Sequence, residues 1–227
     1  MRNAIDLGNG FIVTTDNSGG IGEKPRDLVA VPDRVTAYFA ARVALLEQWA
    51  SHAEPISILI HNFSGSSSWE NYVAGVTDLF REVGQDVPAI SGSSETNMEL
   101  VQSAMAITMI GKKEKAPISE KVSWFTYGIP LVGNEVRECA EDIASVALIY
   151  EALKSGIVHQ IWPVGSSGIL KEVRLLTGNK QARVETVLDT AKSAGPATVV
   201  ILAIPETKMT EAQAIFGALL NKLQMYT

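Results

Sequence analysis

Four polar loops rich in small residues adjoin short apolar segments along the chain, and this alternation is the feature that most constrains its fold. The loops span residues 16–24, 91–97, 165–168 and 189–196. Glycine allows a backbone to approach a ligand closely, and successive N–H groups that point one way suit a phosphate. The pattern therefore predicts strands flanked by loops that either bind a phosphorylated ligand or serve only as turns.

The first loop, the glycine-rich segment Asp16–Lys24, follows the β-branched run Phe11–Thr15. We expect a strand that ends before Asp16, whose carboxylate can then hold a divalent metal while Lys24 neutralises phosphate charge. These two are the candidate catalytic residues. The candidate phosphate contacts of the segment are Asn17, Ser18, Gly19, Gly20 and Gly22. The segment fits neither the P-loop pattern nor the dinucleotide fingerprint, so an ordinary turn remains the alternative.

Two further carboxylates suggest a metal site. Glu95 belongs to the second loop, and Glu47 lies on a helix predicted over residues 34–53. Mg²⁺ takes oxygen ligands from a few carboxylates and from substrate phosphates, so Asp16, Glu47 and Glu95 can form a nucleotide–Mg²⁺ site for phosphoryl transfer. The candidate nucleotide contacts of the second loop are Gly92, Ser93, Ser94, Thr96 and Asn97. The alternatives are that Glu47 faces solvent and that the three acids are unrelated.

The third and fourth loops are candidate substrate contacts. The third consists of Gly165, Ser166, Ser167 and Gly168 and opens a helix predicted over residues 169–176, whose positive end can bind an anion. The fourth contains Lys192 and Ser193 and precedes a buried strand predicted over residues 198–204.

The order of predicted elements indicates an α+β or α/β protein with two domains. Strands are expected over residues 4–7, 11–14, 27–31, 56–60, 104–110, 122–127, 183–188 and 198–204, and helices over 34–53, 69–83, 135–155, 169–176 and 210–223. Residues 117–120 mark the predicted boundary. We therefore expect domains over residues 1–117 and 118–227.

Composition excludes several classes of protein. The net charge of the 227 residues is −6 and the basic residues are scattered, which argues against a nucleic-acid or anionic-membrane partner. Cys139 is the single cysteine, so an internal disulfide is excluded. No apolar run reaches the roughly 18 residues of a membrane span, and the N-terminus lacks a signal pattern, so we expect a cytoplasmic protein.

Several motifs resemble the aminoimidazole ribonucleotide synthetase (PurM-like) superfamily, which includes thiamine-monophosphate kinase, selenophosphate synthetase and a hydrogenase-maturation protein. Thr15-Asp16 matches an early Thr-Asp of that family. Ala44–Pro55 loosely matches a helix signature, with Glu47 in place of a metal-binding Asp and His52 in place of a Gly. Gly92–Thr96 resembles a Gly-Gly-Asp-Thr loop, with Glu in place of its Asp, and Ser167-Gly168-Ile169 resembles a Gly-Gly-Leu loop.

Four segments resemble, more narrowly, the short PurM-like branch of α-ribazole kinases, which act in salvage for the lower loop of cobalamin. The segments are Asp16–Gly22, Ser91–Asn97, Pro163–Ile169 and Lys192–Thr198.

The resemblance implies an N-terminal domain that has a mixed sheet with helices on one face and that dimerises by joining strands into a shared barrel. It implies ATP bound near the dimer interface, Mg²⁺ held by the three acids, and a shortened C-terminal α/β domain whose two loops contact phosphate or acceptor. The reaction implied is ATP-dependent phosphorylation of a ribosyl hydroxyl. The alternatives are another ATP-dependent PurM-like synthetase and a non-catalytic nucleotide-binding dimer.

Overall fold

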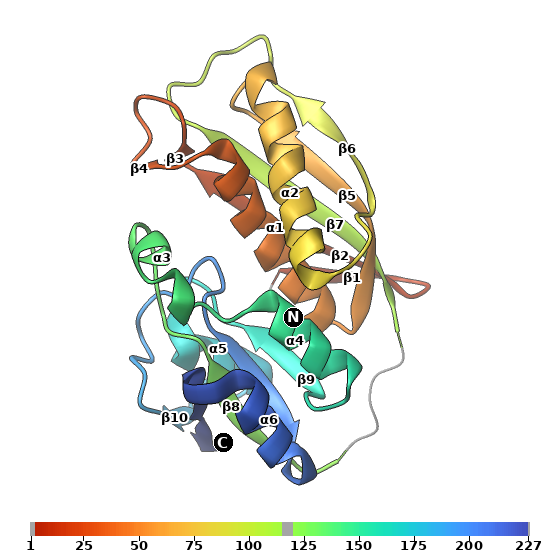
Figure 1. Cartoon of the computed structure of the whole chain (residues 1–227), viewed down its shortest axis with the longest axis vertical. Coiled ribbons are helices and arrows are strands. Elements are labelled where there is room, and N and C mark those ends of the chain that lie inside the picture. Colours follow the sequence, from red (N-terminus) through yellow and green to blue (C-terminus); the bar gives the residue numbers. More distant parts are fainter. Residues whose placement is uncertain (1–2, 115–119, 227) are drawn as a thin grey trace. The chain divides into compact units, whose positions relative to one another are not determined.

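The computed structural model describes residues 3–114 and 120–226 (Figure 1). It divides into two compact units, Asn3–Glu114 and the chain from Lys115 onward, which we call the N-terminal and the C-terminal unit. Residues 117–119 of the predicted boundary lie outside the described part of the chain. Every helix within that part is too short or too polar to cross a membrane.

The N-terminal unit is built on a five-stranded mixed sheet. Its elements are β1 (Ala4–Gly8), β2 (Phe11–Gly19), β3 (Ile21–Gly22), β4 (Val29–Ala30), α1 (Asp33–Ala50), β5 (Ala53–Asn62), a 3-10 turn (Ser66–Ser68), α2 (Trp69–Val83), β6 (Ala89–Ser94) and β7 (Ala104–Lys113). The strand order is β1-β2-β7-β5-β6, in which only β5 and β6 run parallel. β3 and β4 form a separate parallel pair within the connection between β2 and α1, which we call the glycine loop (residues 20–32).

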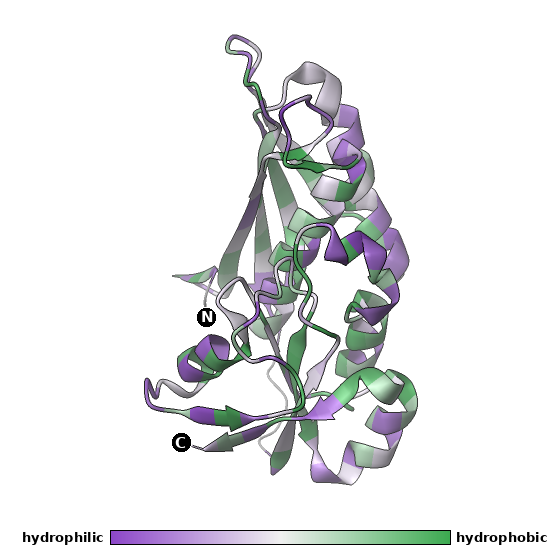
Figure 2. Ribbon diagram, turned by 90° about the vertical axis from the view of Figure 1, so that its left-hand side faces the viewer, coloured by the Kyte–Doolittle hydropathy of each residue, from purple (hydrophilic) through white to green (hydrophobic). Residues whose placement is uncertain are grey.

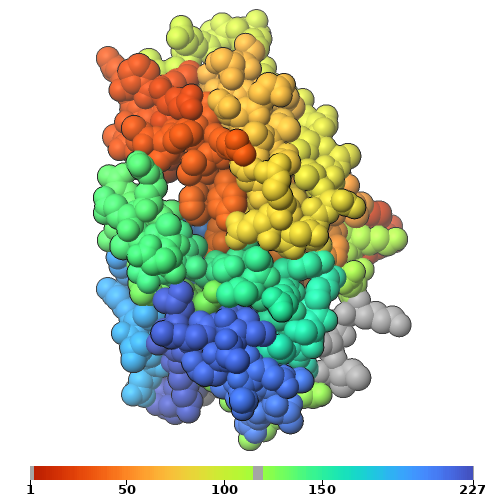
Figure 3. All heavy atoms as spheres, viewed as in Figure 1, coloured from red at the N-terminus to blue at the C-terminus, as the bar shows by residue number. Residues whose placement is uncertain are grey.

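Both helices of this unit lie on one side of the sheet (Figure 2), and α2 forms much of the surface on that side (Figure 3). α1 packs against β2, β7 and α2, and its residues from Ala40 to Ala50 are all buried. The two helices cross closely because Gly75 of α2 has no side chain: a Cβ there would lie 2.1 Å from the Arg34 carbonyl oxygen. Gln48 of α1 reaches the sheet, where its amide donates to the Met109 carbonyl at 2.9 Å.

The other side of this sheet carries no helix of the described N-terminal unit. Side chains alternate between the two faces of a strand. Ile12 of β2 is buried beneath the helices, so Val13 and its cross-strand partner Ile5 lie on the opposite face. Ile5 and Leu7 are 64% and 59% exposed, which leaves apolar surface on this side.

Several predictions for this unit are confirmed and three need correction. The strands predicted over residues 4–7 and 11–14 are present and pair as a hairpin, and the helix over residues 69–83 is present. β2, however, continues through Asp16 to Gly19, because β7 pairs with it along its whole length. β6 likewise includes Gly92, Ser93 and Ser94, which β5 pairs in parallel. The helix predicted over residues 34–53 ends at Ala50, because β5 begins at Ala53 and includes Pro55 at an irregularity in its pairing with β7.

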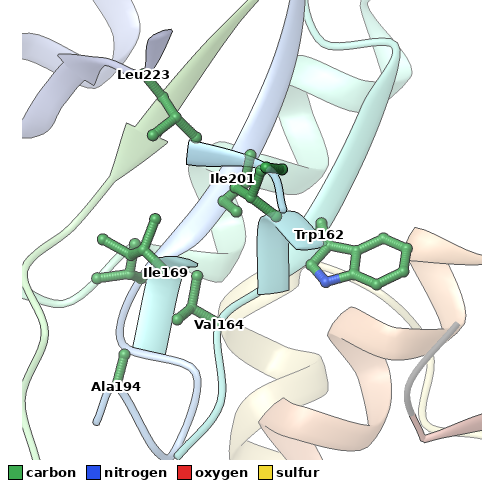
Figure 4. Packing of buried hydrophobic residues seen from close by; sticks show 9 residues of the cluster. Trp162, Val164, Ile169, Ala194, Ile201 and Leu223 are labelled. Carbon is green, nitrogen blue, oxygen red and sulfur yellow. The ribbon is translucent and has the colours of Figure 1, made fainter. Parts of the chain in front are cut away.

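The C-terminal unit has a four-stranded antiparallel sheet of order β12-β8-β11-β9 and a smaller β10–β13 pair. Its elements are β8 (Val122–Tyr127), α3 (Glu135–Glu138), a 3-10 turn (Ala140–Asp142), α4 (Val146–Lys154), β9 (Gln160–Pro163), α5 (Gly168–Thr177), β10 (Arg183–Glu185), β11 (Val200–Pro205), a 3-10 turn (Glu206–Lys208), α6 (Met209–Phe216), a 3-10 turn (Gly217–Leu219), β12 (Leu220–Lys222) and β13 (Gln224–Tyr226). A core cluster packs α5 against the sheet through residues such as Ile169, Ile201 and Trp162 (Figure 4).

Two predicted helices of this unit are shorter than expected. The helix predicted over residues 135–155 is split, and α4 begins only after Ser145, whose side chain accepts a hydrogen bond from the Leu148 N–H. The helix predicted over residues 210–223 ends at Phe216, because Gly217 turns the chain with a positive φ and Leu220 then joins the sheet.

Candidate functional site

Strand register brings the first two polar loops to one end of the N-terminal sheet. Ser18 pairs with Met105, Met105 with Asn62, and Asn62 with Ser94. The end of β2, the start of β7 and the ends of β5 and β6 therefore lie side by side. The glycine-rich segment and the Gly92–Asn97 segment therefore both lie at this end of the sheet, although about 70 residues separate them in sequence.

Asp16 lies within β2 on the face that is turned toward the helices. It alternates in phase with Ile12 and Thr14, which are buried, and the Thr14 hydroxyl donates to the Ala44 carbonyl of α1 at 2.9 Å. Asp16 itself is half-buried. The strand β2 therefore positions the Asp16 carboxylate, two residues before Ser18. Asn17 and Gly19 lie on the opposite, more exposed face.

Glu47 is buried on α1, with 3% of its surface exposed, so the alternative that it faces solvent is wrong. Its neighbours on the helix, Leu46 and Gln48, are also fully buried. In the ranges 3–114 and 120–226, no three His, Cys, Asp or Glu side chains lie close enough together to hold a metal ion. Asp16, Glu47 and Glu95 are therefore not gathered into one ready-made metal cage.

Glu95 is half-buried just after β6 and folds back on its own backbone. Its N–H donates to the Asn62 carbonyl at 2.7 Å, and its Oε1 accepts from the N–H groups of Asn97 (2.6 Å) and Met98 (3.1 Å). The hydrogen bond from Asn97, followed by that from Met98, lowers the pKa of Glu95 below its usual value. The carboxylate is therefore charged at neutral pH, and one of its oxygens is occupied by its own loop.

The glycine loop is tied to the segment that leads into β7. The Gly20 N–H donates to the Ser103 carbonyl at 2.8 Å, and the Lys24 ammonium donates to the Leu100 carbonyl at 2.6 Å. Asp27 accepts from the N–H groups of Lys24 (2.8 Å) and Ser103 (2.7 Å). Three of these four bonds join the glycine loop to the segment before β7, so the two segments hold each other in place. Lys24 has two further ammonium hydrogens with which to meet a phosphate.

Asp27 is a structural residue that the sequence analysis missed. Partial burial raises its pKa, but the hydrogen bonds from the Ser103 backbone, the Ser103 side chain and the Lys24 backbone outweigh this, and the net shift is downward. No local signal pointed to this role, because an Asp in a turn usually caps the N–H two residues ahead, whereas Asp27 accepts from Lys24, three residues behind it.

A buried polar network next to the paired residues Asn62 and Ser94 joins β5, α2 and β7. Asn62 donates to the Ser94 hydroxyl at 2.9 Å and to the Gly65 carbonyl at 2.7 Å. The hydroxyls of Ser64 and Tyr72 are 2.7 Å apart, and Ser64 Oγ also accepts from the Ala104 N–H at 3.0 Å. The network fixes the strand ends on which the two polar loops are mounted.

The candidate substrate loops of the C-terminal unit adjoin each other. Gly168 has a φ of +77°, and a Cβ there would lie 2.7 Å from the Thr190 carbonyl oxygen, so only glycine fits. The Ala194 N–H donates to Gly165, and the Leu170 N–H donates to Thr190 at 3.0 Å. One of the first free amides of α5 is therefore already used by the chain, and fewer remain for an anion than the sequence suggested.

Two ion contacts border these loops. Lys192 pairs with Glu135 at 2.9 Å, and this lysine contact is the first cause of the lowered pKa of Glu135. The buried carboxylate of Glu172 accepts from the Trp162 indole at 2.9 Å and, more weakly, from the Gly165 N–H at 3.4 Å. Ser166, Ser167 and Ser193 complete the loops, and the Ser193 hydroxyl accepts from the Gly195 N–H at 3.4 Å.

No family model matches the chain, and no curated protein sequence matches it either. Solved structures do match. The hydrogenase maturation protein HypE has 14% sequence identity and a TM-score of 0.63, covering 96% of this chain and 81% of that one. The thiamine monophosphate kinase of Aquifex aeolicus has 10% identity and a TM-score of 0.65, covering 99% of this chain and 88% of that one.

Two of the similar structures were solved with nucleotides: HypE in complex with ATP (TM-score 0.60, 13% identity, 96% of this chain and 78% of that one) and the kinase AaThiL with AMPPCP and TMP (TM-score 0.60, 11% identity, 97% and 82%). The chain therefore has the PurM-like fold. His52 agrees with this assignment, because it has a φ of +52° at the position where the family's helix signature has glycine.

Proposed function

We propose that the chain is an ATP- and Mg²⁺-dependent kinase that phosphorylates a small-molecule alcohol. The observation that carries the proposal is the strand register that brings the glycine-rich segment, with Asp16, to the same sheet end as the Glu95 loop. The fold gives further support, since it is shared with structures solved with ATP and with AMPPCP. Phosphoryl transfer needs mainly positioning and charge neutralisation, which two acids and a glycine loop can supply without a dedicated nucleophile.

Asp16 and Glu95 are proposed as ligands of Mg²⁺, which supplies charge neutralisation at the phosphates when bound. Mg²⁺ commonly takes only one or two carboxylates and completes its shell with phosphates and water. The absence of a three-acid cage among the described residues is compatible with this mode. Glu47 is proposed as a third, buried contributor, and Lys24 and the glycine loop as the groups that meet the phosphates.

The acceptor proposed is α-ribazole, on the strength of the four sequence segments that resemble the α-ribazole kinase branch. The loops at residues 165–168 and 192–196 are proposed to bind it. A non-catalytic nucleotide-binding protein is the second candidate, because the described acids do not form a complete metal site.

We further propose that the protein is a homodimer joined through the helix-free side of the N-terminal sheet. Ile5, Leu7 and Phe11 expose apolar surface there, and a second copy is the partner that the resemblance implies.

The test is a calorimetric and thermal-shift titration with ATP, with and without Mg²⁺. A ligand that binds only the folded chain stabilises it by RT ln(1 + [L]/Kd), about 2.7 kcal/mol at a hundredfold excess over Kd. We expect Mg²⁺-dependent stabilisation that weakens in Asp16→Asn and Glu95→Gln. Asp86→Asn is the matched control, because Asp86 is exposed and precedes β6 at the end opposite Glu95.

Turnover with α-ribazole should then yield a phosphomonoester. Binding of ATP without turnover of any candidate alcohol would favour the non-catalytic alternative. No stabilisation at millimolar ATP would mean that the glycine loop is only a turn, and the kinase proposal would fail.

A further inference from the structure

Asp33 is a buried acid that the proposed phosphoryl transfer does not use. It is the first residue of α1 and is 3% exposed. Within the part of the chain that the structure describes, its Oδ1 accepts no hydrogen bond although the atom is fully buried. A buried carboxylate usually has both oxygens satisfied, because leaving charge unpaired in the interior is costly. The unpartnered oxygen needs an explanation.

Asp33 packs directly under the glycine loop. Gly22 has a φ of +155°, and a Cβ there would lie 2.8 Å from Asp33 Oδ1 and 2.4 Å from Ser103 Oγ. The two polar atoms therefore occupy the space beside Gly22 that a side chain would need. Gly22 also fixes the loop's return path, because it pairs with Ala30 and its carbonyl accepts from the Val31 N–H at 3.1 Å.

On its other side Asp33 joins the buried polar network. Its side chain is hydrogen-bonded to Ser68, at the start of α2, and Ser68 is in turn hydrogen-bonded to Tyr72. Tyr72 continues the chain of contacts to Ser64 and so to the start of β7. Asp33 is thus the link between the glycine loop and the network that holds the strand ends.

The charged and titratable groups that act on Asp33 are all acidic. Glu23 and Asp27 face it from the glycine loop, Tyr72 faces it from α2, and its own N–H donates to Glu23 at 3.3 Å. Burial is the main cause that raises the pKa of Asp33, and the charges of Glu23 and Asp27 raise it further. Hydrogen bonds with the Ser68 side chain and with the Glu23 backbone lower it, but the net shift is upward. No cation is among these groups to pair with an ionised Asp33.

We infer that Asp33 is a positioning residue that holds the glycine loop as a neutral carboxylic acid, and that its ionisation releases the loop. A neutral acid carries no charge that must be paired, so a buried Oδ1 without a donor costs less than it would on a carboxylate. An ionised Asp33 would place a third negative charge beside Glu23 and Asp27. A negative charge beside the loop would also repel a phosphate, and this consequence for nucleotide binding rests on the proposed function. The effect of ionisation on the loop itself is independent of the proposed function.

The test compares the wild-type protein with Asp33→Asn, which keeps the shape of the side chain and removes its ionisation. Hydrogen exchange of the Gly20, Leu28, Val29 and Val31 amides reports on the loop, since each donates to a backbone carbonyl within or beside it. The intrinsic exchange rate of each unprotected amide at the same pH is divided by its measured exchange rate, which gives the protection factor. We expect protection in the wild type to fall as pH rises, by at most tenfold per pH unit, since one proton is linked to the opening. Protection in Asp33→Asn should stay constant.

A second measurement needs no variant. The ¹³C shift of the Asp33 carboxyl carbon, followed by titration of the wild-type protein, should give a midpoint above the ordinary value of 3.8. A midpoint at or below that value would overturn the inference, as would equal pH dependence of loop protection in both proteins, or loss of protection in Asp33→Asn at every pH. Titration with Mg²⁺-ATP separates the two proposals: a pH-dependent loop in a protein that binds no nucleotide would uphold the role of Asp33 and refute the kinase.

Discussion

Gly22 and Gly19 stand three residues apart in the same segment, yet replacement by alanine should affect them in opposite ways. At Gly22 an added Cβ would lie 2.4 Å from Ser103 Oγ, 2.6 Å from Ser103 Cβ and 2.8 Å from Asp33 Oδ1. Ser103 Cβ is fixed to the backbone and both side chains are buried, so the buried cluster must move. At Gly19 no atom lies within 4 Å of the Cβ position and φ is not positive.

The expected magnitudes follow from these geometries. Overpacking at Gly22 costs about 1–3 kcal/mol, and its φ of +155° adds about 1–3 kcal/mol for an L-residue, so Gly22→Ala should lower the free energy of unfolding by about 2–6 kcal/mol. Gly19→Ala should change it by less than about 0.5 kcal/mol, or raise it slightly, because the residue lies in a strand. Urea denaturation followed by far-UV circular dichroism measures both.

The pair also tests the site. If the backbone at Gly19 approaches a phosphate, Gly19→Ala should keep the stability of the free protein and lose the extra stabilisation by Mg²⁺-ATP. A Gly19→Ala protein that binds ATP as the wild type does would remove Gly19 from the proposed site. A Gly22→Ala protein of wild-type stability would refute the reasoning about the packing of Asp33 and Ser103.

Three further predictions concern the core, the pH dependence of stability and the dimer. Gln48→Ala should cost about 2–4 kcal/mol, because the buried amide donates to Ile12, Thr14 and Met109 and its loss leaves a cavity and unpaired acceptors; Gln181→Ala, at an exposed position, is the control in the same denaturation assay. The pKa of Asp33 is raised in the folded state, so its stabilising contribution is complete below pH 3.8 and is lost as pH rises through the folded value; Asp33→Asn should therefore gain stability relative to the wild type with rising pH. Ile5→Lys should convert a dimer to monomers in analytical ultracentrifugation without loss of fold, whereas Leu175→Lys, at an exposed apolar site on α5 of the other unit, should not; a monomeric wild type would refute the dimer.

Sequence patterns predicted the elements that local chemistry determines. Residues 69–83 have apolar side chains at helical spacing and are followed by a glycine. α2 has these bounds and ends at Gly84 in the left-handed conformation. The patterns failed where pairing with a neighbouring strand determines the secondary structure. Nothing in Asp16–Ser18 favours a strand, but β7 offers an unbroken ladder to Gly19, so tertiary pairing overrides the local preference. The same holds for Leu220–Lys222, which leaves its predicted helix to pair with β8.

The candidate site was predictable in position but not in its supporting groups. The two polar loops were recognisable because each follows an apolar run, and the register that unites them is a property of the sheet. Asp33, Ser103 and Tyr72 were not recognisable, because an acid at a helix start and scattered hydroxyls are common and only burial makes them unusual here. Buried polar networks are formed by residues far apart in sequence, so a single sequence cannot reveal them.

Glu95, a proposed ligand of Mg²⁺, already accepts hydrogen bonds from its own loop. The Glu95 carboxylate folds back and accepts the N–H groups of Asn97 and Met98, as the shorter Asp189 does with those of Ala191 and Lys192, so it caps its own loop. Glu95→Gln keeps an acceptor for this cap and removes the charge, whereas Glu95→Ala removes both. Loss of Mg²⁺-ATP stabilisation in both variants would assign the carboxylate to the metal. Loss in Glu95→Ala alone would assign it to the loop, and Asp16 would then be the metal ligand that this sheet end must supply.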